Sequence, residues 1–212
     1  MKKIMFNEHY GLETATLNGS KTRTSRIEFH TNANLAGVNF FTKPNLDVRY
    51  AIFDFDNGKS YKSRYGIGEV VAIAQSYEDA ENVIVKKIVS HASTDEDKIL
   101  LKKLQSITSS PGIGNKMFVK SELMPHQIQI TDIKLERMQD ISDEDCIKEG
   151  IEISSQGLYF CKGIELKGAR EGICKCFETP REAFASLIDK VIGKGTWAKN
   201  PWVVAYCYKL VK

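Results

Sequence analysis

The stretch Met124–Ile151, MPHQIQITDIKLERMQDISDEDCIKEGI, joins a predicted strand to a predicted helix. From Gln127 to Met138 apolar and polar residues alternate, which is typical of a strand within a sheet. Ser142 is a favourable helix N-cap, the three acidic residues after it suit the positive start of a helix, and Gly150 is a common helix end. The stretch therefore predicts a mixed α+β fold.

The residues before this stretch add a predicted hairpin. Segments 50–55 and 59–65 flank the turn Asp56-Asn57-Gly58, and their composition is typical of paired strands. Residues 69–74 predict a further strand. At the start of the chain, a short apolar run at Ile4–Phe6 predicts a strand, and Asn7 to Leu17 predicts a helix that ends at Asn18-Gly19.

Helical periodicity dominates two other parts of the chain. It extends from Tyr77 to Ile107 with a polar break, and residues 108–115 predict a loop. Thr179-Pro180-Arg181-Glu182 is a capping box with proline at the first helical position, so it predicts a helix to about Ile192. Trp202 to Val211 predicts a final strand.

The order of these elements favours one domain. Strands occur near both ends and in the middle, helices of unequal length separate them, and no repeat or low-complexity linker divides the chain. We therefore predict a single domain over residues 1–212 with a helical insertion at about 77–116. A mixed β-barrel decorated with helices fits this order better than regular βαβ alternation.

Composition places the chain among ordinary globular proteins. Of the 212 residues, 42% are apolar, and 30 basic against 27 acidic residues give a net charge of +3. This excess is too small for a protein that coats long stretches of duplex, so any nucleic-acid role must depend on a local site. No apolar stretch approaches the roughly 18 residues that span a bilayer. Because the N-terminal segment soon turns polar, we expect no signal peptide, no membrane partner and a cytoplasmic protein.

Five cysteines bear on redox state and metals. In the cytoplasm we expect reduced thiols, since an odd number with irregular spacing argues against a disulfide framework. A zinc site would need a second ligand pair near Cys174-Lys175-Cys176, and the four histidines are scattered. We therefore expect neither a metal nor another cofactor. The five positions are Cys146, Cys161, Cys174, Cys176 and Cys207.

Three segments in a fixed order carry a resemblance to a known family. They are GSKTRTSR at 19–26, the stretch at 124–151, and PREAFASLIDKVIGKGTWAKNPWVVAYCYKL at 180–210, with GIGEVVAIA at 66–74 between the first two. The first segment resembles the Gly-x-Lys-Thr-x-Thr-x-Arg signature of the ASCH family. The second and third resemble its strand with acidic helix and the closing helix and strand of longer phage and bacterial members. The resemblance covers nearly the whole chain and implies a PUA-like barrel.

The resemblance also implies site residues. In hydrolase-like ASCH members that act on acetylated cytidine, a lysine, a threonine and a glutamate are catalytic, and they match Lys21, Thr24 and Glu149. Thr24 would attack or orient water, Lys21 would act as a base if burial lowers its pKa, and Glu149 would move a proton. Phage-type members carry two arginines after the second threonine, whereas Ser25 precedes Arg26 here. The hydrolase-like members also lack the first arginine.

Other candidate ligand-binding residues have alternative structural roles. Arg26 can hold a phosphate or stack on a base, or it can pair with the acidic residues at 143–145. Trp197 and Trp202 flank a segment containing Asn200 and can form a stacking wall for a base, or they can belong to the core. Likewise, the three residues matched to the catalytic set can be an exposed lysine, a strand threonine and a helix-ending glutamate.

Three functions from different classes follow. The first is a module whose partner is RNA or a modified nucleoside, bound by Lys21, Arg26, Trp197, Asn200 and Trp202. The second is an amidohydrolase acting on N4-acylated cytidine, so the sequence leaves open whether the protein is an enzyme. The third is a phage or host accessory protein that works through protein contacts, for which the helical segment at 77–107 is the support.

Overall fold

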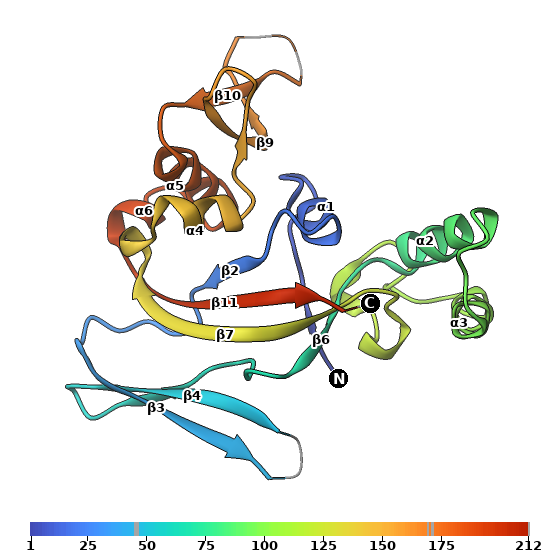
Figure 1. Ribbon diagram of the computed structural model, residues 1–212, viewed down its shortest axis with the longest axis horizontal. Helices are drawn as coiled ribbons and strands as arrows, with labels where there is room; N and C mark the ends of the chain where they lie inside the picture. The colour runs from blue at the N-terminus through green and yellow to red at the C-terminus, as the bar shows by residue number, and fades with distance from the viewer. Residues whose placement is uncertain (45–46, 169, 171, 212) are drawn as a thin grey trace. The chain divides into compact units, whose positions relative to one another are not determined.

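Figure 1 shows a computed structural model of the chain, which describes residues 1–44, 47–168, 170 and 172–211. The chain forms two compact units. Unit 1 contains Met1–Phe6, Val70–Gln129 and the chain end from Leu210, whereas unit 2 contains Asn7–Glu69 and Ile130–Lys209. The predicted helical insertion at about 77–116 falls within unit 1 together with strands on either side of it. The single-domain organisation stays a prediction.

Unit 1 combines short strands with a helical pair. β1 pairs in parallel with β6, and β6 pairs antiparallel with the beginning of β7. Ser76 and Thr94 are the N-caps of the two helices, and each accepts a hydrogen bond from the backbone three residues later. The elements are β1 (Lys2–Ile4), β6 (Val70–Ile73), α2 (Tyr77–Val89), α3 (Asp95–Gln105), η1 (Lys116–Phe118), η2 (Ser121–Leu123) and the first residues of β7 (Gln127–Arg137).

The core of unit 1 lies between these helices and β6. Small residues on β6 and α2 allow close packing, and Ala72, Ala80 and Ile84 are fully buried. Burial of such apolar side chains is the main force that holds a helix pair onto strands. The buried cluster consists of Ala72, Ala74, Tyr77, Ala80, Ile84, Leu104, Val119 and Met124.

Unit 2 contains most of the strands, in three groups. β2 pairs antiparallel with β11, which neighbours β7; β4 pairs with β3 and β5; β9 pairs with β8 and β10. Figure 1 shows β7 and β11 running side by side along this unit. The strands are β2 (Arg23–Arg26), β3 (Leu35–Lys43), β4 (Val48–Phe55), β5 (Ser60–Lys62), β7 from Ile130, β8 (Glu152–Ile153), β9 (Tyr159–Glu165), β10 (Cys174–Phe177) and β11 (Trp202–Leu210).

The helices of unit 2 from residue 143 onward lie together near one end of β7 and β11, whereas its first helix lies apart from them (Figure 1). α5 packs on α4, α6, β9 and β10, and its apolar stripe supplies much of the core. This helix begins at the capping box, as predicted. The helical elements are α1 (Leu12–Leu17), η3 (Met138–Asp140), α4 (Asp143–Lys148), α5 (Pro180–Val191) and α6 (Thr196–Lys199). The buried cluster is Met138, Ile141, Cys146, Ile151, Cys161, Ile164, Ala183, Phe184, Leu187, Ile188 and Val203.

The mixed α+β class is confirmed, but the predicted closed barrel is wrong for the part of the chain that the structure describes. Each group of strands there is an open sheet with two edge strands. A barrel closes only if both edge strands pair with each other, and alternation within single strands does not report that pairing. Among the same described residues, every helix is too short or too polar to cross a membrane.

The first helix also begins later than predicted. The sequence favoured a helix from Asn7, whereas α1 starts at Leu12 after a turn. Gly11 has a left-handed backbone with φ of 67°, which interrupts a right-handed helix. A Cβ atom at this position would also lie 3.0 Å from the Lys162 side chain. The late start leaves α1 and the turn after it to lead directly into the segment around Lys21.

Candidate functional site

Lys21 lies within unit 2, between the end of α1 and the start of β2, and its side chain points into the protein. Only 2% of the residue is exposed. Its ammonium nitrogen donates to the backbone oxygens of Arg23 and Glu149 at 2.7 and 2.6 Å, and to the Glu149 carboxylate at 2.8 Å. An ammonium group has three donors, so these acceptors match its capacity. Lys21 is therefore held by a complete set of hydrogen bonds.

Glu149 ends α4 and meets Lys21 although 128 positions separate them. Ser142 caps the start of α4, as predicted, by accepting a hydrogen bond from the Asp145 amide. Gly150 follows with φ of 103°, and a Cβ atom there would lie 3.1 Å from the Leu12 side chain. A glycine at this position thus ends the helix in a left-handed backbone and avoids a tight contact with Leu12.

The electrostatics of Lys21 have two opposing causes. Burial lowers its pKa from the usual 10.5, because the charged form loses hydration, and the positive charge of Arg26 lowers it further. The charge and hydrogen bond of Glu149 act in the opposite direction. Burial has the larger effect, so the Lys21 pKa is lower than that of an exposed lysine.

Arg23 is a buried part of this site that the sequence did not indicate. Its guanidinium forms ion pairs with Glu136 on β7 and Asp145 on α4, and its Nε lies 3.7 Å from a Glu149 oxygen. Arg23 is 2% exposed and Glu136 is 4% exposed. The positive charge of Arg23 therefore balances the negative charges of carboxylates on β7 and α4. The ion pair with the acidic start of α4, considered for Arg26 in the sequence, is made by Arg23.

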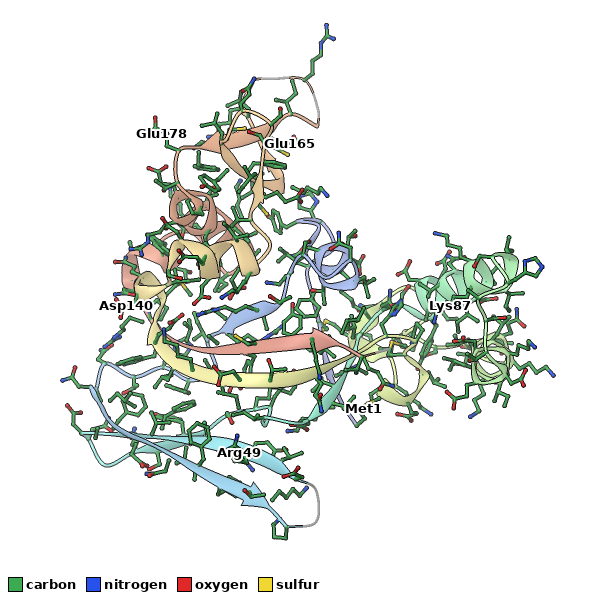
Figure 2. All side chains as sticks on the ribbon, in the orientation of Figure 1. Met1, Arg49, Lys87, Asp140, Glu165 and Glu178 are labelled. Atoms are coloured by element: carbon green, nitrogen blue, oxygen red, sulfur yellow. The ribbon has the colours of Figure 1, made fainter. Side chains whose placement is uncertain are left out.

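Chain connectivity explains how these carboxylates come together. Figure 2 shows Asp140 at the turn where β7 ends and the chain leads into α4. Glu136 lies just before this turn, and Asp145 and Glu149 lie just after it. Charged residues of opposite sign at buried positions of two strands, Arg23 on β2 and Glu136 on β7, are the signal that could have revealed the cluster.

Thr24 and Arg26 lie on the opposite face of β2 from Arg23, since side chains alternate along a strand. In the β2–β11 register, Thr24 faces Tyr206 and Arg26 faces Val204. Thr24 is 6% exposed, whereas Arg26 is half-buried. The structure brings Lys21 and Glu149 into contact, and the Arg26 charge acts on Lys21, with Thr24 on the strand between the two cations.

Trp202 is half-buried at the start of β11. Its indole nitrogen donates to the Ala33 backbone oxygen at 3.1 Å, and its ring is 5.8 Å from that of Phe55 in an edge-to-face contact. The Arg137 guanidinium lies 4.2 Å from the ring centre. Trp202 therefore packs within unit 2, and its ring face is covered by the Arg137 guanidinium. Its part in ligand binding stays a prediction.

Trp197 and Asn200 lie on and just after α6, where they have partners of their own. The Trp197 ring is 6.1 Å from Phe184 in the helical core, and its backbone oxygen accepts from the Gln139 side chain at 2.8 Å. The Asn200 side-chain oxygen accepts a hydrogen bond from the backbone amide of Gln139 at 2.8 Å. Trp197 and Trp202 thus pack against different parts of unit 2, and these contacts do not join them into one wall.

Two surface depressions of unit 2 lie elsewhere. One, of about 620 Å³, borders β10 and α5, and the other, of about 460 Å³, borders the starts of α4 and α5. Neither is lined by Lys21, Thr24, Arg26 or Glu149. In the described ranges, no group of three or more His, Cys, Asp or Glu side chains is placed to hold a metal ion. The candidate site is therefore defined by the buried charges around Lys21 and not by either depression.

Comparison with known proteins adds no relative. No protein-family model matches the chain, and no curated protein or solved structure matches it significantly.

Proposed function

We propose that unit 2 binds a modified nucleoside or a base of RNA at a site formed by Lys21, Thr24, Arg26 and Glu149. The observation that carries this proposal is the buried Lys21–Glu149 ion pair, whose side chains are 2% and 6% exposed. Removing two charges from water costs free energy that their attraction often fails to recover, and apolar residues frequently serve stability equally well. A buried pair of this kind therefore supports a role in ligand binding.

The chemistry of these groups suits a nucleobase. A carboxylate such as Glu149 accepts hydrogen bonds from the exocyclic amine of cytosine, and a guanidinium such as Arg26 holds a phosphate or stacks on a base. The resemblance of GSKTRTSR, at 19–26, to the signature of the PUA-like ASCH family supports the same ligand class.

Thermal unfolding in the presence of candidate ligands tests the proposal. The panel consists of cytidine, N4-acetylcytidine, uridine, adenosine, guanosine and short single-stranded RNAs. A ligand that binds only the folded state at 100 times its dissociation constant stabilises it by about 2.7 kcal/mol, so the melting temperature rises. We expect a rise with at least one member and a smaller rise in Arg26→Ala. An unchanged melting temperature across the panel would contradict the proposal.

Arg26 also predicts how binding depends on salt. If the ligand is a short RNA, Arg26→Ala should weaken binding and reduce the slope of log affinity against log salt by about one counterion. Arg49→Ala is a matched control, because this arginine is exposed on β4, as Figure 2 shows. Fluorescence anisotropy of labelled RNA between low and moderate salt measures both. Equal affinity and slope in Arg26→Ala and the wild type would remove Arg26 from the site.

A second candidate function is hydrolysis of an N4-acylated cytidine. The observation that favours it is the 2.8 Å hydrogen bond between Lys21 and Glu149, together with the lowered Lys21 pKa. A proton can move from the lysine to the carboxylate while all three hydrogen bonds persist, because a neutral amine donates two bonds and accepts one. Such a pair can serve as base and then acid near a substrate amide.

A further inference from the structure

Glu28 and Tyr206 form a second polar pair in unit 2. The Tyr206 hydroxyl donates to Glu28 Oε1 at 2.8 Å, and the Arg64 backbone amide donates to Glu28 Oε2 at 2.9 Å and to the tyrosine hydroxyl at 2.9 Å. Tyr206 is fully buried and packs edge-to-face on Tyr65, with 5.2 Å between the ring centres. The Glu28 carboxylate is half-buried and held in a fixed orientation by these partners.

This pair belongs to the same neighbourhood as the proposed site. Tyr206 is the register partner of Thr24, so both side chains project from one face of the β2–β11 pair. Burial raises the pKa of Glu28 and lowers that of Lys21, and the Arg26 charge has a smaller lowering effect on both. The β2–β11 register therefore places the Glu28–Tyr206 pair beside Thr24, and the charge of Arg26 acts on both carboxylate pairs.

Glu28 keeps capacity for further hydrogen bonds. Each of its oxygens accepts from one group in the Tyr206 and Arg64 pair, whereas a carboxylate offers about four acceptor positions. Burial raises the Glu28 pKa, whereas these donors and the two nearby arginines lower it. Additional donors from a ligand would therefore be favourable at this carboxylate.

We propose that Glu28 binds the 2′- and 3′-hydroxyls of a ribose, so that the ligand of this site is a ribonucleoside or a ribonucleotide unit and not its deoxy counterpart. This inference rests on the proposed function, because it assigns the sugar of the same ligand. A carboxylate that accepts from ribose hydroxyls is an established solution in nucleotide-binding folds, and the 2′-hydroxyl is the group that distinguishes RNA from DNA. The orientation set by Tyr206 and Arg64 prepares Glu28 for this task before the ligand arrives.

The charge of Glu28 disfavours an alternative occupant. A phosphate at Glu28 would place two anions together, and like charges in a partly buried site repel strongly. Hydroxyl groups are neutral donors, so they satisfy the carboxylate without that cost. Any phosphate of the ligand should lie nearer to Arg26 than to Glu28.

Isothermal titration calorimetry on the full chain tests the inference with matched pairs of nucleosides. The probes are cytidine, adenosine, guanosine and N4-acetylcytidine, each beside its 2′-deoxy form. A lost hydrogen bond to a charged group weakens binding by about 10- to 100-fold, so we expect this preference for the ribose form in the wild type. Glu28→Gln should reduce the preference to about threefold or less, and Glu178→Gln, an exposed carboxylate after β10, should leave it unchanged.

The outcomes separate the two proposals. Equal affinity for ribose and deoxyribose forms would overturn the inference while leaving nucleoside binding in place. Absence of binding for every nucleoside and for short RNA would overturn the proposed function, and the inference with it. A preference that persists in folded Glu28→Gln would assign ribose recognition to another residue. The wild-type comparison decides the ligand class even if the variant fails to fold.

Discussion

Arg23→Met is expected to lower the free energy of unfolding by about 3–5 kcal/mol, the usual cost of removing one partner from a buried ion pair. The substitution would leave the Glu136 carboxylate, which is 4% exposed, with the outer Lys134 as its remaining ion-pair partner. It would also remove the cation nearest to Asp145, and Glu149 would keep Lys21 as its partner. Urea unfolding followed by circular dichroism measures the difference.

Two further variants identify the cause of this loss. Arg49→Met changes an exposed arginine of the same unit, and surface substitutions of this kind usually alter stability by less than about 0.5 kcal/mol. In the Arg23→Met background, Glu136→Gln should restore part of the stability because it removes an uncompensated buried charge. A loss below about 1 kcal/mol in Arg23→Met, or no recovery in the double variant, would show that the cluster contributes little.

Helices with strong local signals could be predicted from the sequence. The N-cap Ser142, the capping box that begins at Thr179, and the glycine end at Gly150 all behave as predicted, because capping depends on residues within one turn. The hairpin of β4 and β5 was also predictable, since its turn residues specify the reversal. These elements position Glu149.

Other strands lacked such signals. β3 (Leu35–Lys43) is largely exposed, so it shows no strong alternation, yet it pairs along its length with β4. β9 and β10 pair across a register shift, and a bulge of this kind is not encoded in hydrophobic periodicity. The predicted barrel failed for a related reason. Sheet closure depends on pairing between distant strands, which one sequence does not specify.

The candidate site was partly within reach of the sequence. The resemblance at 19–26 and 124–151 predicted that Lys21 and Glu149 share a site, and the two residues are in contact. The role of Arg23 could not be predicted from the sequence, because its ion-pair partner Glu136 lies 113 positions away. Glu28 was missed because the tyrosine that fixes it lies on the last strand. The Arg23–Glu136 and Glu28–Tyr206 contacts both form between residues that are distant in the sequence, so no local sequence pattern indicates them.

Lys21→Ala and Glu149→Gln should each lower the deacetylation of N4-acetylcytidine by about 10²- to 10⁴-fold, the range for loss of a general acid or base. The expectation follows from the 2.8 Å contact of these groups and from the burial that lowers the Lys21 pKa, because a lysine with a lowered pKa spends more time in the neutral form that can accept a proton. Chromatography of the purified protein with this substrate measures product formation over time.

Glu178→Gln is the matched control for Glu149→Gln, since it changes an exposed carboxylate of the same unit and should keep full activity. Circular dichroism must show that both site variants remain folded, because Lys21→Ala leaves Glu149 buried without its lysine. Activity that survives both site substitutions would assign the reaction to other residues. The wild type could also bind N4-acetylcytidine without turning it over. In that case the Lys21–Glu149 pair serves recognition alone, because a general base acts only on a substrate amide within hydrogen-bond reach.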